Sequence, residues 1–420
     1  MIQTINACRI CKSRTIIPVF SLGDLYVSDF IDPAKIDEEK SLHAPLELVF
    51  CDVAQGGCGL LQLKHSVSPD IMYGAHYWYL SGVTQTMKNA LLDIVQKAEK
   101  LILLKEGDVV LDIGCNDGTL LNAYSSKGLL LGGFEPSKNL IPHASKVTPY
   151  VINDFFNYNS YQKVFGDKKA KIITSIAMFY DLEEPDEFVA DIGKSIDEYG
   201  LWIIQMSYLP SMLEQNAFDN ICHEHLEYYS LSVLQYLLEK HGLKVIDVEL
   251  NEVNGGSIRT YIVPSTNTTI VPFPGAEERI RGLLEREKEL GLDTRKVYDE
   301  FSRRVEHIKN EVSDFIRHEV DSGKKVYVYG ASTKGNTLLQ YFELDQSLIT
   351  AAAERSPAKW GKVTIKTHIP IISEEQARQE KPDYFLILPW AFLEEFRKRE
   401  VEFLKSGGKF IIPLPIMQVE

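Results

Sequence analysis

The sequence predicts an α/β protein with two doubly wound domains and a small metal-binding module at its N-terminus. Apolar strand-like runs alternate with helical patterns over residues 71–265, and the same alternation returns after residue 325. Such alternation is typical of βαβ units around a parallel sheet. Four of the six cysteines lie within the first 58 residues, which indicates a separate module. Because 420 residues exceed one ordinary core, we predict three parts, residues 1–70, 71–265 and 266–420.

The expected elements follow one another in a regular order. In the middle part we expect strands at residues 109–113, 132–135, 172–175 and 201–205. A Thr-, Asn- and Pro-rich linker at 265–275 precedes a charged helical stretch, 277–320, which is broken near 291–293. The third part opens with a strand-turn-helix at 325–341 and continues with strands at 348–353, 384–389 and 410–413.

Composition and charge exclude several classes of protein. The formal net charge of −14 argues against nucleic acid or an anionic membrane as a partner. No apolar run approaches the roughly 20 residues of a membrane span, and the N-terminus lacks a signal-peptide pattern. We therefore expect a cytoplasmic protein with a small-molecule substrate. A monomer fits the sequence, which leaves the oligomeric state open.

The clustered cysteines form two pairs. Cys8 and Cys11 make a C-x2-C pair, and Cys51 and Cys58 make a second pair whose longer spacer contains Gly56-Gly57. Four thiolates can surround Zn²⁺ tetrahedrally, and a reducing compartment favours metal over disulfides. We predict a structural zinc site without an open catalytic position. The alternatives are four unligated thiols or a redox pair.

The segment 109–120 is an apolar strand that runs into a glycine-bearing turn and a helix start. It is not the G-x-G-x-x-G of a dinucleotide site, because positions 116 and 119 are Asn and Thr. It resembles the D-x-G-x-x-x-G turn of a class I (Rossmann-like) methyltransferase core, where the amino-acid end of S-adenosylmethionine (SAM) lies against the loop. The predicted cofactor residues of this turn are Asp112, Gly114, Asn116, Asp117 and Gly118.

Three further residues extend this predicted cofactor site. Glu135 follows the second strand, where an acid can accept hydrogen bonds from both ribose hydroxyls. Asp154 could bond the adenine amine and Phe155 could cover the adenine ring. The alternatives are that the glycines only shape a turn and that Phe155 is a core residue.

Four further segments carry a family resemblance: YWYLSG at 77–82, FDNICHEHLEYYS at 218–230, NGGSIR at 254–259 and YGASTKGN at 329–336. With the cysteine pair and the 112–118 turn, they make the chain resemble the C-methyltransferases of nucleotide-linked 4-keto-deoxysugars over nearly its whole length. The resemblance implies a zinc-binding module, a methyltransferase core and a C-terminal sugar-nucleotide domain, in that order. It also implies a nucleotide-diphosphate 4-keto-deoxysugar as substrate, linked to dTDP or GDP and methylated at C3, with C5 as an alternative.

Carbon methylation beside a ketone needs a base, donors for the enolate oxygen and an aligned methyl group. Histidine titrates near neutral pH and can take the proton. By resemblance we predict His225 as the base, with Glu224 and His223 beside it. On an extended segment, positions 223 and 225 would face one way and Glu224 the other. The alternative is that either histidine is a satisfied core residue.

Two positions depart from the resembled family. Cys222 stands where relatives often have tyrosine, and Asp181 stands where some have histidine, so the proton relay is open. We predict both at the substrate. In the aromatic run Tyr73, His76, Tyr77, Trp78 and Tyr79, resemblance favours Tyr77 and Tyr79 as catalytic residues, and a packed linker is the alternative.

The turn after residue 329 makes a second candidate ligand site. Small residues and a helix N-terminus favour an anion, and cations lie on this turn and after the next strand. We predict substrate binding, including a diphosphate clamp, by Thr333, Lys334, Asn336, Arg355, Lys359 and His368. The alternative for each cation is an ordinary solvated charge.

Three other functions compete with C-methylation. O- or N-methylation of a similar sugar would need no removal of an α-proton. The second is an NAD-dependent sugar reductase or epimerase, but the sequence lacks the G-x-G-x-x-G pattern expected of such an enzyme. The third is a non-catalytic zinc-finger adaptor. The acidic net charge of the chain argues against an adaptor that binds nucleic acid.

Overall fold

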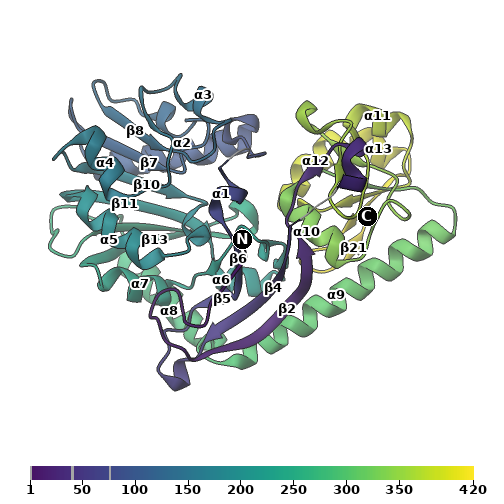
Figure 1. The fold of residues 1–420 in the computed structure, drawn as a ribbon, viewed down its shortest axis with the longest axis horizontal. Helices are drawn as coiled ribbons and strands as arrows, with labels where there is room; N and C mark the ends of the chain where they lie inside the picture. Colours follow the sequence, from purple (N-terminus) through teal and green to yellow (C-terminus); the bar gives the residue numbers. More distant parts are fainter. Residues whose placement is uncertain (1, 39–41, 75–76) are drawn as a thin grey trace.

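The computed structural model describes residues 2–38, 42–74 and 77–420 of the chain. It has two α/β lobes, with the N-terminal strands and a long helix running beneath and between them (Figure 1). The core lobe contains a seven-stranded sheet and the C-terminal lobe a six-stranded sheet. Within the described residues, no helix is both long and apolar enough to cross a membrane.

The core sheet is parallel at its centre and antiparallel at one edge. Its order is β13 (Leu243–Asn251), β14 (Ser257–Pro264), β11 (Ile196–Ser207), β10 (Ala170–Ile176), β7 (Val109–Ile113), β8 (Leu130–Phe134) and β9 (Tyr150–Ile152). The strands from β11 to β9 pair in parallel, as predicted, whereas β14 pairs antiparallel with both β11 and β13. The prediction omitted this β13–β14 hairpin.

Helices cover both faces of the core sheet. Strand β7 is buried on both sides: Val109, Leu111 and Ile113 belong to one apolar cluster and Val110 to another. This period-2 alternation explains its continuous apolar sequence. The covering helices are α2 (Gln85–Leu101), α4 (Tyr158–Phe165), α5 (Pro185–Ser195), α7 (Leu231–Glu239) and α8 (Ala276–Leu290).

The N-terminal strands form a sheet of their own, completed by the core. Its order is β12 (Glu227–Tyr228), β5 (Leu61–Leu63), β4 (His43–Cys51) and β2 (Ile16–Tyr26). Strand β12 belongs to the part predicted as 71–265, so the sheet crosses that boundary. A pair between β1 (Ile2–Thr4) and β6 (His65–Val67) and one between β3 (Phe30–Ile31) and β17 (Val363–Thr364) add further links. The predicted domain limits stay a prediction.

The C-terminal lobe follows the helical stretch. Helix α8 ends at Leu290 and is capped by Gly291, with φ of 70°. Helix α9 (Arg295–Asp321) then leads into the sheet, so the predicted break is confirmed. The sheet order is β18 (Ile371–Ser373), β16 (Ala352–Glu354), β15 (Val326–Tyr329), β19 (Tyr384–Ile387), β20 (Lys409–Ile412) and β21 (Gln418–Val419). The strand predicted at 348–353 begins only at Ala352, because Leu348 and Ile349 close a turn on the carbonyl of Asp345.

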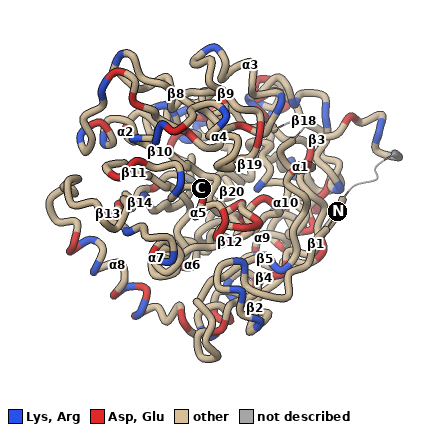
Figure 2. Tube along the Cα trace, turned by 60° about the vertical axis from the view of Figure 1, so that its left-hand side comes forward, with Lys and Arg blue, Asp and Glu red and all other residues tan. Residues whose placement is uncertain are grey.

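Short helices complete this lobe: α10 (Thr333–Tyr341), α11 (Glu374–Gln379), α12 (Leu393–Arg399) and α13 (Val401–Lys405). Figure 2 shows acidic and basic residues interspersed along the chain, including α8, rather than gathered on one side. This distribution suits a solvated surface.

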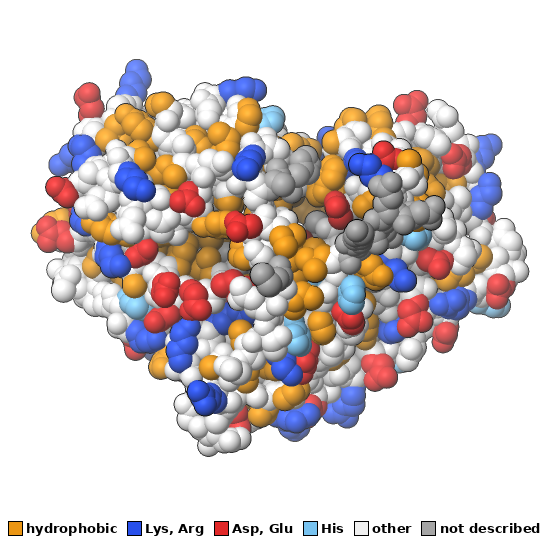
Figure 3. Space-filling view, in the orientation of Figure 1, with side chains coloured by type: hydrophobic (Ala, Val, Ile, Leu, Met, Phe, Trp, Pro, Cys, Tyr) orange, Lys and Arg blue, Asp and Glu red, His pale blue; other side chains and the backbone are white. Residues whose placement is uncertain are grey.

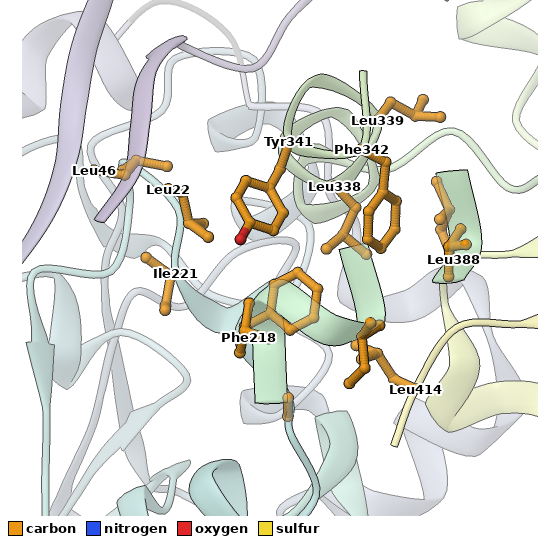
Figure 4. Close-up of a cluster of buried hydrophobic side chains, with 14 of the residues drawn as sticks. Leu22, Leu46, Phe218, Ile221, Leu338, Leu339, Tyr341, Phe342, Leu388 and Leu414 are labelled. Carbon is orange, nitrogen blue, oxygen red and sulfur yellow. The ribbon is translucent and has the colours of Figure 1, made fainter. Parts of the chain in front are cut away.

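One apolar cluster joins all three parts of the chain (Figure 4). Leu22 and Leu46 come from the N-terminal strands, Phe218 from the core, and Tyr341 and Phe342 from the end of α10. The Phe218 ring meets those of Tyr341 and Phe342 edge-on, with centroids 5.6 and 5.9 Å away. The segment that begins at Phe218 is therefore anchored by the packing of the three parts together.

Candidate active site

The four N-terminal cysteines converge on one point. All four sulfur atoms lie within 4.8 Å of one another, with Cys8 and Cys58 3.6 Å apart and Cys11 and Cys51 3.5 Å apart. Tetrahedral Zn–S bonds of about 2.3 Å place sulfur atoms roughly 3.8 Å apart. The close backbone fold of the longer spacer depends on Gly57, where a Cβ would meet the Cys51 sulfur at 2.6 Å. The geometry fits a structural zinc ion.

A single cavity of about 710 Å³ lies at the carboxyl ends of the core strands and reaches the C-terminal lobe. Figure 3 shows the molecule indented between its lobes, with hydrophobic side chains on the walls. The core contributes the turn after β7, Glu135, and the segments around Met178 and His225. The other lobe contributes residues 332–334 and 388–392. Ligands of α/β sheets bind at this edge, so the cavity is the candidate active site.

The turn after β7 leaves room for a ligand at its backbone. Gly114 has φ of 73°, and a Cβ there would lie 3.2 Å from the Met178 side chain. Asp112 is buried beneath the turn and accepts a 2.6 Å hydrogen bond from Thr174 Oγ1. Burial raises the pKa of Asp112 to about 7. This half-neutral acid can accept or donate at the cofactor end of the cavity.

Glu135 is fixed by two backbone donors. Its Oε2 accepts from the Asn116 N–H at 2.9 Å and its Oε1 from the Ser137 N–H at 2.8 Å. Burial raises its pKa above the ordinary value. A carboxylate oxygen has a second lone pair, so each oxygen can accept a further hydrogen bond, and Glu135 lines the cavity. This arrangement suits a diol such as a ribose.

A strap at residues 77–83 crosses the same turn. Asn116 accepts from the Ser81 N–H and donates to the Tyr79 carbonyl, at 3.0 and 3.1 Å, and Asp117 accepts from the Gly82 N–H at 2.7 Å. Asp117 and Gly118 do not line the cavity, so the structure assigns them to the turn and strap. Asp112, Gly114, Asn116 and Glu135 do line it.

Asp154 and Phe155 both line the cavity. Asp154 accepts from Ser160 Oγ at 2.9 Å and from Asn157 at 3.2 Å, both through Oδ2. Phe155 is 37% exposed, so it is not a core residue. Both positions are compatible with the predicted contacts to an adenine ring.

The segment that carries His223, Glu224 and His225 is a turn rather than an extended strand. The His225 N–H bonds the Cys222 carbonyl at 3.1 Å, which closes the turn. Consequently Cys222, Glu224 and His225 all line the cavity, whereas His223 bonds the Ala44 carbonyl at 2.9 Å through Nε2. The prediction that 223 and 225 face one way, opposite Glu224, is wrong. The structure does not bring His223 to the reacting groups.

His225 is held from two sides. Its Nδ1 lies 2.8 Å from the Asn220 carbonyl oxygen, and its ring centroid lies 4.2 Å from that of Tyr180. A carbonyl only accepts, so Nδ1 carries the proton and Nε2 keeps its lone pair. Burial, followed by the nearby Lys334 ammonium, lowers the pKa of His225 well below 6.5. The imidazole is therefore neutral at physiological pH.

Three acids and one cation line the same cavity. Asp219 is buried, Asp181 and Glu224 are partly buried, and each has one buried side-chain oxygen without a hydrogen-bond partner. Burial and the charge of Glu224 raise the pKa of Asp181 well above its ordinary value. Lys334 reaches in from α10 and donates to Asn220 Oδ1 at 2.6 Å. Its charge acts on all three acids, where it opposes the rise in pKa that burial causes.

The aromatic run lies partly at the site. Tyr77 and Tyr79 both line the cavity, and the Tyr77 ring lies 5.7 Å from that of Tyr73. Burial raises the pKa of Tyr77 well above 10, so its hydroxyl stays a donor. Tyr79 is 47% exposed. Trp78 donates to Asp29 Oδ1 at 3.1 Å, and His76 lies outside the described residues.

The predicted diphosphate clamp does not form. Lys359 is drawn away from the cavity: its ammonium donates to the Ala331 carbonyl at 2.6 Å and lies 4.6 Å above the Phe30 ring. Arg355 is largely exposed, 3.7 Å from Glu395. Asn336 donates to Ser28 and Asp29 and joins the N-terminal strands to α10. His368 lies in a left-handed turn with φ of 52°, and of the predicted set only Thr333 and Lys334 line the cavity.

Sequence reasoning missed several lining residues. Met178 follows strand β10, and Trp390 and Phe392 follow β19. The rule that ligands lie beyond the carboxyl ends of parallel strands could have found both segments. Asp219 lies inside the quoted 218–230 segment but has no sequence signal that separates it from a surface acid.

Comparison with known proteins identifies the family. Three family models match the parts of the chain in order: a zinc-binding domain over residues 8–73, a methyltransferase domain over 83–248 and a C-methyltransferase C-terminal domain over 252–415. The chain is also 30% identical over 416 residues to the C-methyltransferase NovU of Streptomyces niveus, covering 99% of this chain and 97% of that protein. The chain is a member of the C-methyltransferase family. Its three-part order is that of the predicted resemblance.

Solved methyltransferase structures show weaker likeness. A magnesium protoporphyrin IX methyltransferase from Synechocystis PCC 6803 with bound SAM is 13% identical, with a TM-score of 0.31, over 43% of this chain and 79% of that one. A SAM-dependent methyltransferase from Clostridium acetobutylicum is 12% identical, with a TM-score of 0.33, over 43% and 92%. The assignment depends on the family models and on NovU.

This C-methyltransferase takes its methyl group from SAM and holds a zinc ion in its N-terminal module. The result excludes the NAD-dependent reductase and the adaptor, and it gives no support to O- or N-methylation.

Glu135→Gln tests the cofactor end of the cavity of this C-methyltransferase. A glutamine amide nitrogen cannot accept, so the variant loses a charged acceptor. We expect the affinity for S-adenosylhomocysteine (SAH) to fall at least about 10-fold, since hydrogen bonds to charged groups contribute about 1.5–3 kcal/mol. Calorimetric titration measures this loss. An unchanged SAH affinity, or tight binding of NAD in its place, would contradict the site.

Cys51→Ser tests the metal site of this C-methyltransferase. The variant removes one thiolate, so we expect loss of bound zinc and a lower thermal midpoint, because site formation contributes to folding. Elemental analysis of the purified protein measures the zinc. The control is Cys115→Ser, a buried cysteine outside the cluster, which should keep the metal. Equal zinc in both variants would rule out this ligand set.

Proposed function

We propose that this C-methyltransferase methylates the carbon beside the ketone of a nucleotide-diphosphate 4-keto-deoxysugar, at C3, through an enolate. One observation carries the proposal. A single cavity joins the cofactor turn after β7 to His225 and to the N-terminus of α10. A methyl donor, a neutral imidazole and room for a second ligand therefore share one enclosed space.

His225 acts as the base. Its Nδ1–H is engaged with the Asn220 carbonyl, so Nε2 is the atom that removes the α-proton. The electron pair of the broken C–H bond becomes the enolate, and the carbon then attacks the methyl group. SAM, when bound, supplies that electrophilic methyl and leaves as SAH. A positioned base of this kind accelerates the reaction about 10²- to 10⁴-fold.

The acids and Lys334 stabilise the enolate oxygen. The raised pKa of Asp181 favours its protonated form, which donates a hydrogen bond. Burial also raises the pKa of Glu224 and Asp219, and the charge of the Lys334 ammonium opposes that rise. Position 222 is Cys222 and not tyrosine, so no phenol is available there. These groups, together with the Tyr77 hydroxyl, supply the hydrogen-bond donors instead.

The C-terminal wall receives the nucleotide. Trp390 and Phe392 offer aromatic faces for a base, and Ser332 and Thr333 present hydroxyls at the N-terminus of α10 for phosphate oxygens. Both dTDP and GDP remain candidates. We place the reaction in the cytosol, where reduced thiols retain a four-cysteine zinc site.

Exchange of substrate hydrogen tests this function. A panel of 4-keto-deoxysugars linked to dTDP and GDP is incubated with the enzyme and SAH in deuterated water. Deuterium at C3 is the expected result, and deuterium at C5 would move the methylated carbon there. With SAM, mass spectrometry should find one added methyl on carbon. Methylation on oxygen or nitrogen without exchange would refute the enolate.

A further inference from the structure

Arg9 lies inside the zinc knuckle, between Cys8 and Cys11, and points into the protein. Its side chain is 2% exposed. Its backbone N–H donates to Gln62 Oε1 at 3.0 Å, and its Nη1 donates to the Leu63 carbonyl at 2.6 Å. These bonds attach the knuckle to β5, and they hold the guanidinium in place.

Two acids of the core face this guanidinium. Arg9 Nε lies 3.5 Å from Glu227 Oε1 and 3.6 Å from Glu183 Oε2. The Glu227 side chain is fully buried, and neither of its oxygens has a hydrogen-bond partner. A buried carboxylate without a cation is costly, so Glu227 depends on Arg9 more than Glu183 does, whose side chain is 22% exposed.

The two acids belong to the segments that carry the predicted chemistry. Glu183 lines the cavity two residues after Asp181, and Glu227 follows two residues after His225. The segments are joined directly, because the Leu226 N–H donates to the Tyr180 carbonyl at 2.7 Å. The ring of Tyr180 in turn packs on His225 at 4.2 Å. A shift of either acid would therefore move the imidazole.

We propose that Arg9 is a positioning residue through which the zinc knuckle fixes the two cavity segments 180–184 and 222–227. It does not touch the substrate. It joins the knuckle to both segments at once and offsets the repulsion between Glu183 and Glu227. The proposal rests on the cavity being the methyl-transfer site, and not on the identity of the sugar.

A second ion pair joins the same two regions and serves as a matched control. Lys12 Nζ lies 2.6 Å from Glu184 Oε2, but both side chains are about half exposed, at 54% and 55%. Exposed pairs contribute about 0–1 kcal/mol. Lys12→Met therefore removes a cation from the knuckle without leaving a buried charge.

The experiment compares Arg9→Met with Lys12→Met in the full-length zinc-loaded protein. We expect Arg9→Met to keep its zinc, to bind SAH within about threefold of wild type and to lose about 100-fold in kcat, the effect of roughly 1 Å of misplacement. Hydrogen exchange of the peptide 222–229 should be at least about tenfold faster, because opening becomes easier. Lys12→Met should match wild type. If the two variants behave alike, the proposal is wrong.

A rescue variant tests the charge argument. Adding Glu227→Gln to Arg9→Met removes the uncompensated carboxylate, so slow exchange and part of kcat should return. If Arg9→Met alone does not fold, recovery of folded protein by Glu227→Gln is the same test. No recovery would overturn the proposal. The exchange readout needs no substrate, so failure of every sugar tested would count against the sugar assignment and leave the Arg9 result standing.

Discussion

His225→Gln should lower kcat for methyl transfer about 10²- to 10⁴-fold, the contribution of a positioned base. The amide can still donate to the Asn220 carbonyl that now receives Nδ1–H, but it has no basic nitrogen. Exchange of the substrate α-hydrogen should stop, while SAH affinity changes little. Kinetics with SAM and exchange with SAH measure the two effects.

His223→Gln is the matched control, since His223 bonds the Ala44 carbonyl away from the cavity. It should retain exchange activity in the fraction that folds. If His225→Gln exchanges hydrogen at the wild-type rate, another group is the base, and the Asp181–Glu224 pair is the next candidate.

The pH profile gives an independent check on the base. Burial depresses the pKa of His225 below 6.5, so the neutral base persists as pH falls. We expect kcat/KM to hold through pH 6.5 and to decline only below it, when the imidazole takes up a proton. A decline centred near an ordinary histidine pKa would mean that the imidazole is solvated.

Phe218→Ala should reduce the free energy of unfolding by about 3–5 kcal/mol, as expected for truncation of a buried aromatic residue. Phe218 is fully buried where the three parts meet, against Tyr341 and Phe342. Urea denaturation followed by circular dichroism measures the loss. The effect is large because truncation leaves a cavity, and we expect the neighbouring side chains, which come from three parts of the chain, to be unable to move in and fill it.

Leu103→Ala is its control, because Leu103 is 83% exposed. Surface changes of this kind usually stay within about 0.5 kcal/mol. A loss near 1 kcal/mol for Phe218→Ala would mean that the lobes separate easily and that the joint cluster is weak.

The parallel core and the cofactor turn could be predicted because their signals are local. A strand buried on both faces followed by Gly114 is a pattern within a few residues, and Glu135 follows from the next strand. The helix predicted after this turn is only a short 3-10 helix, Leu121–Ala123. The β13–β14 hairpin does have a local turn signal, Asn254-Gly255-Gly256, which the prediction did not use. Its edge position depends on antiparallel pairing with β11, which is a long-range property.

Part of the predicted anion site lies away from the cavity for a physical reason. Lys359 and Asn336 look like ligand residues beside a glycine turn, but each satisfies backbone or side-chain groups of the N-terminal strands or its own lobe. Residues that join parts distant in sequence cannot be told from binding residues until the parts are docked. The predicted direction of the His223 side chain was likewise wrong, because the residue lies in a turn and not in a strand.

The shared apolar cluster limits how this family can recombine. Leu22, Phe218 and Tyr341 pack in one apolar cluster although more than 300 residues separate the first from the last. Exchanging the C-terminal lobe with that of a relative would leave mismatched shapes at this contact unless the facing side chains were exchanged with it. New specificities should therefore arise by point changes on the cavity walls, and hybrid enzymes should need a jointly transplanted interface.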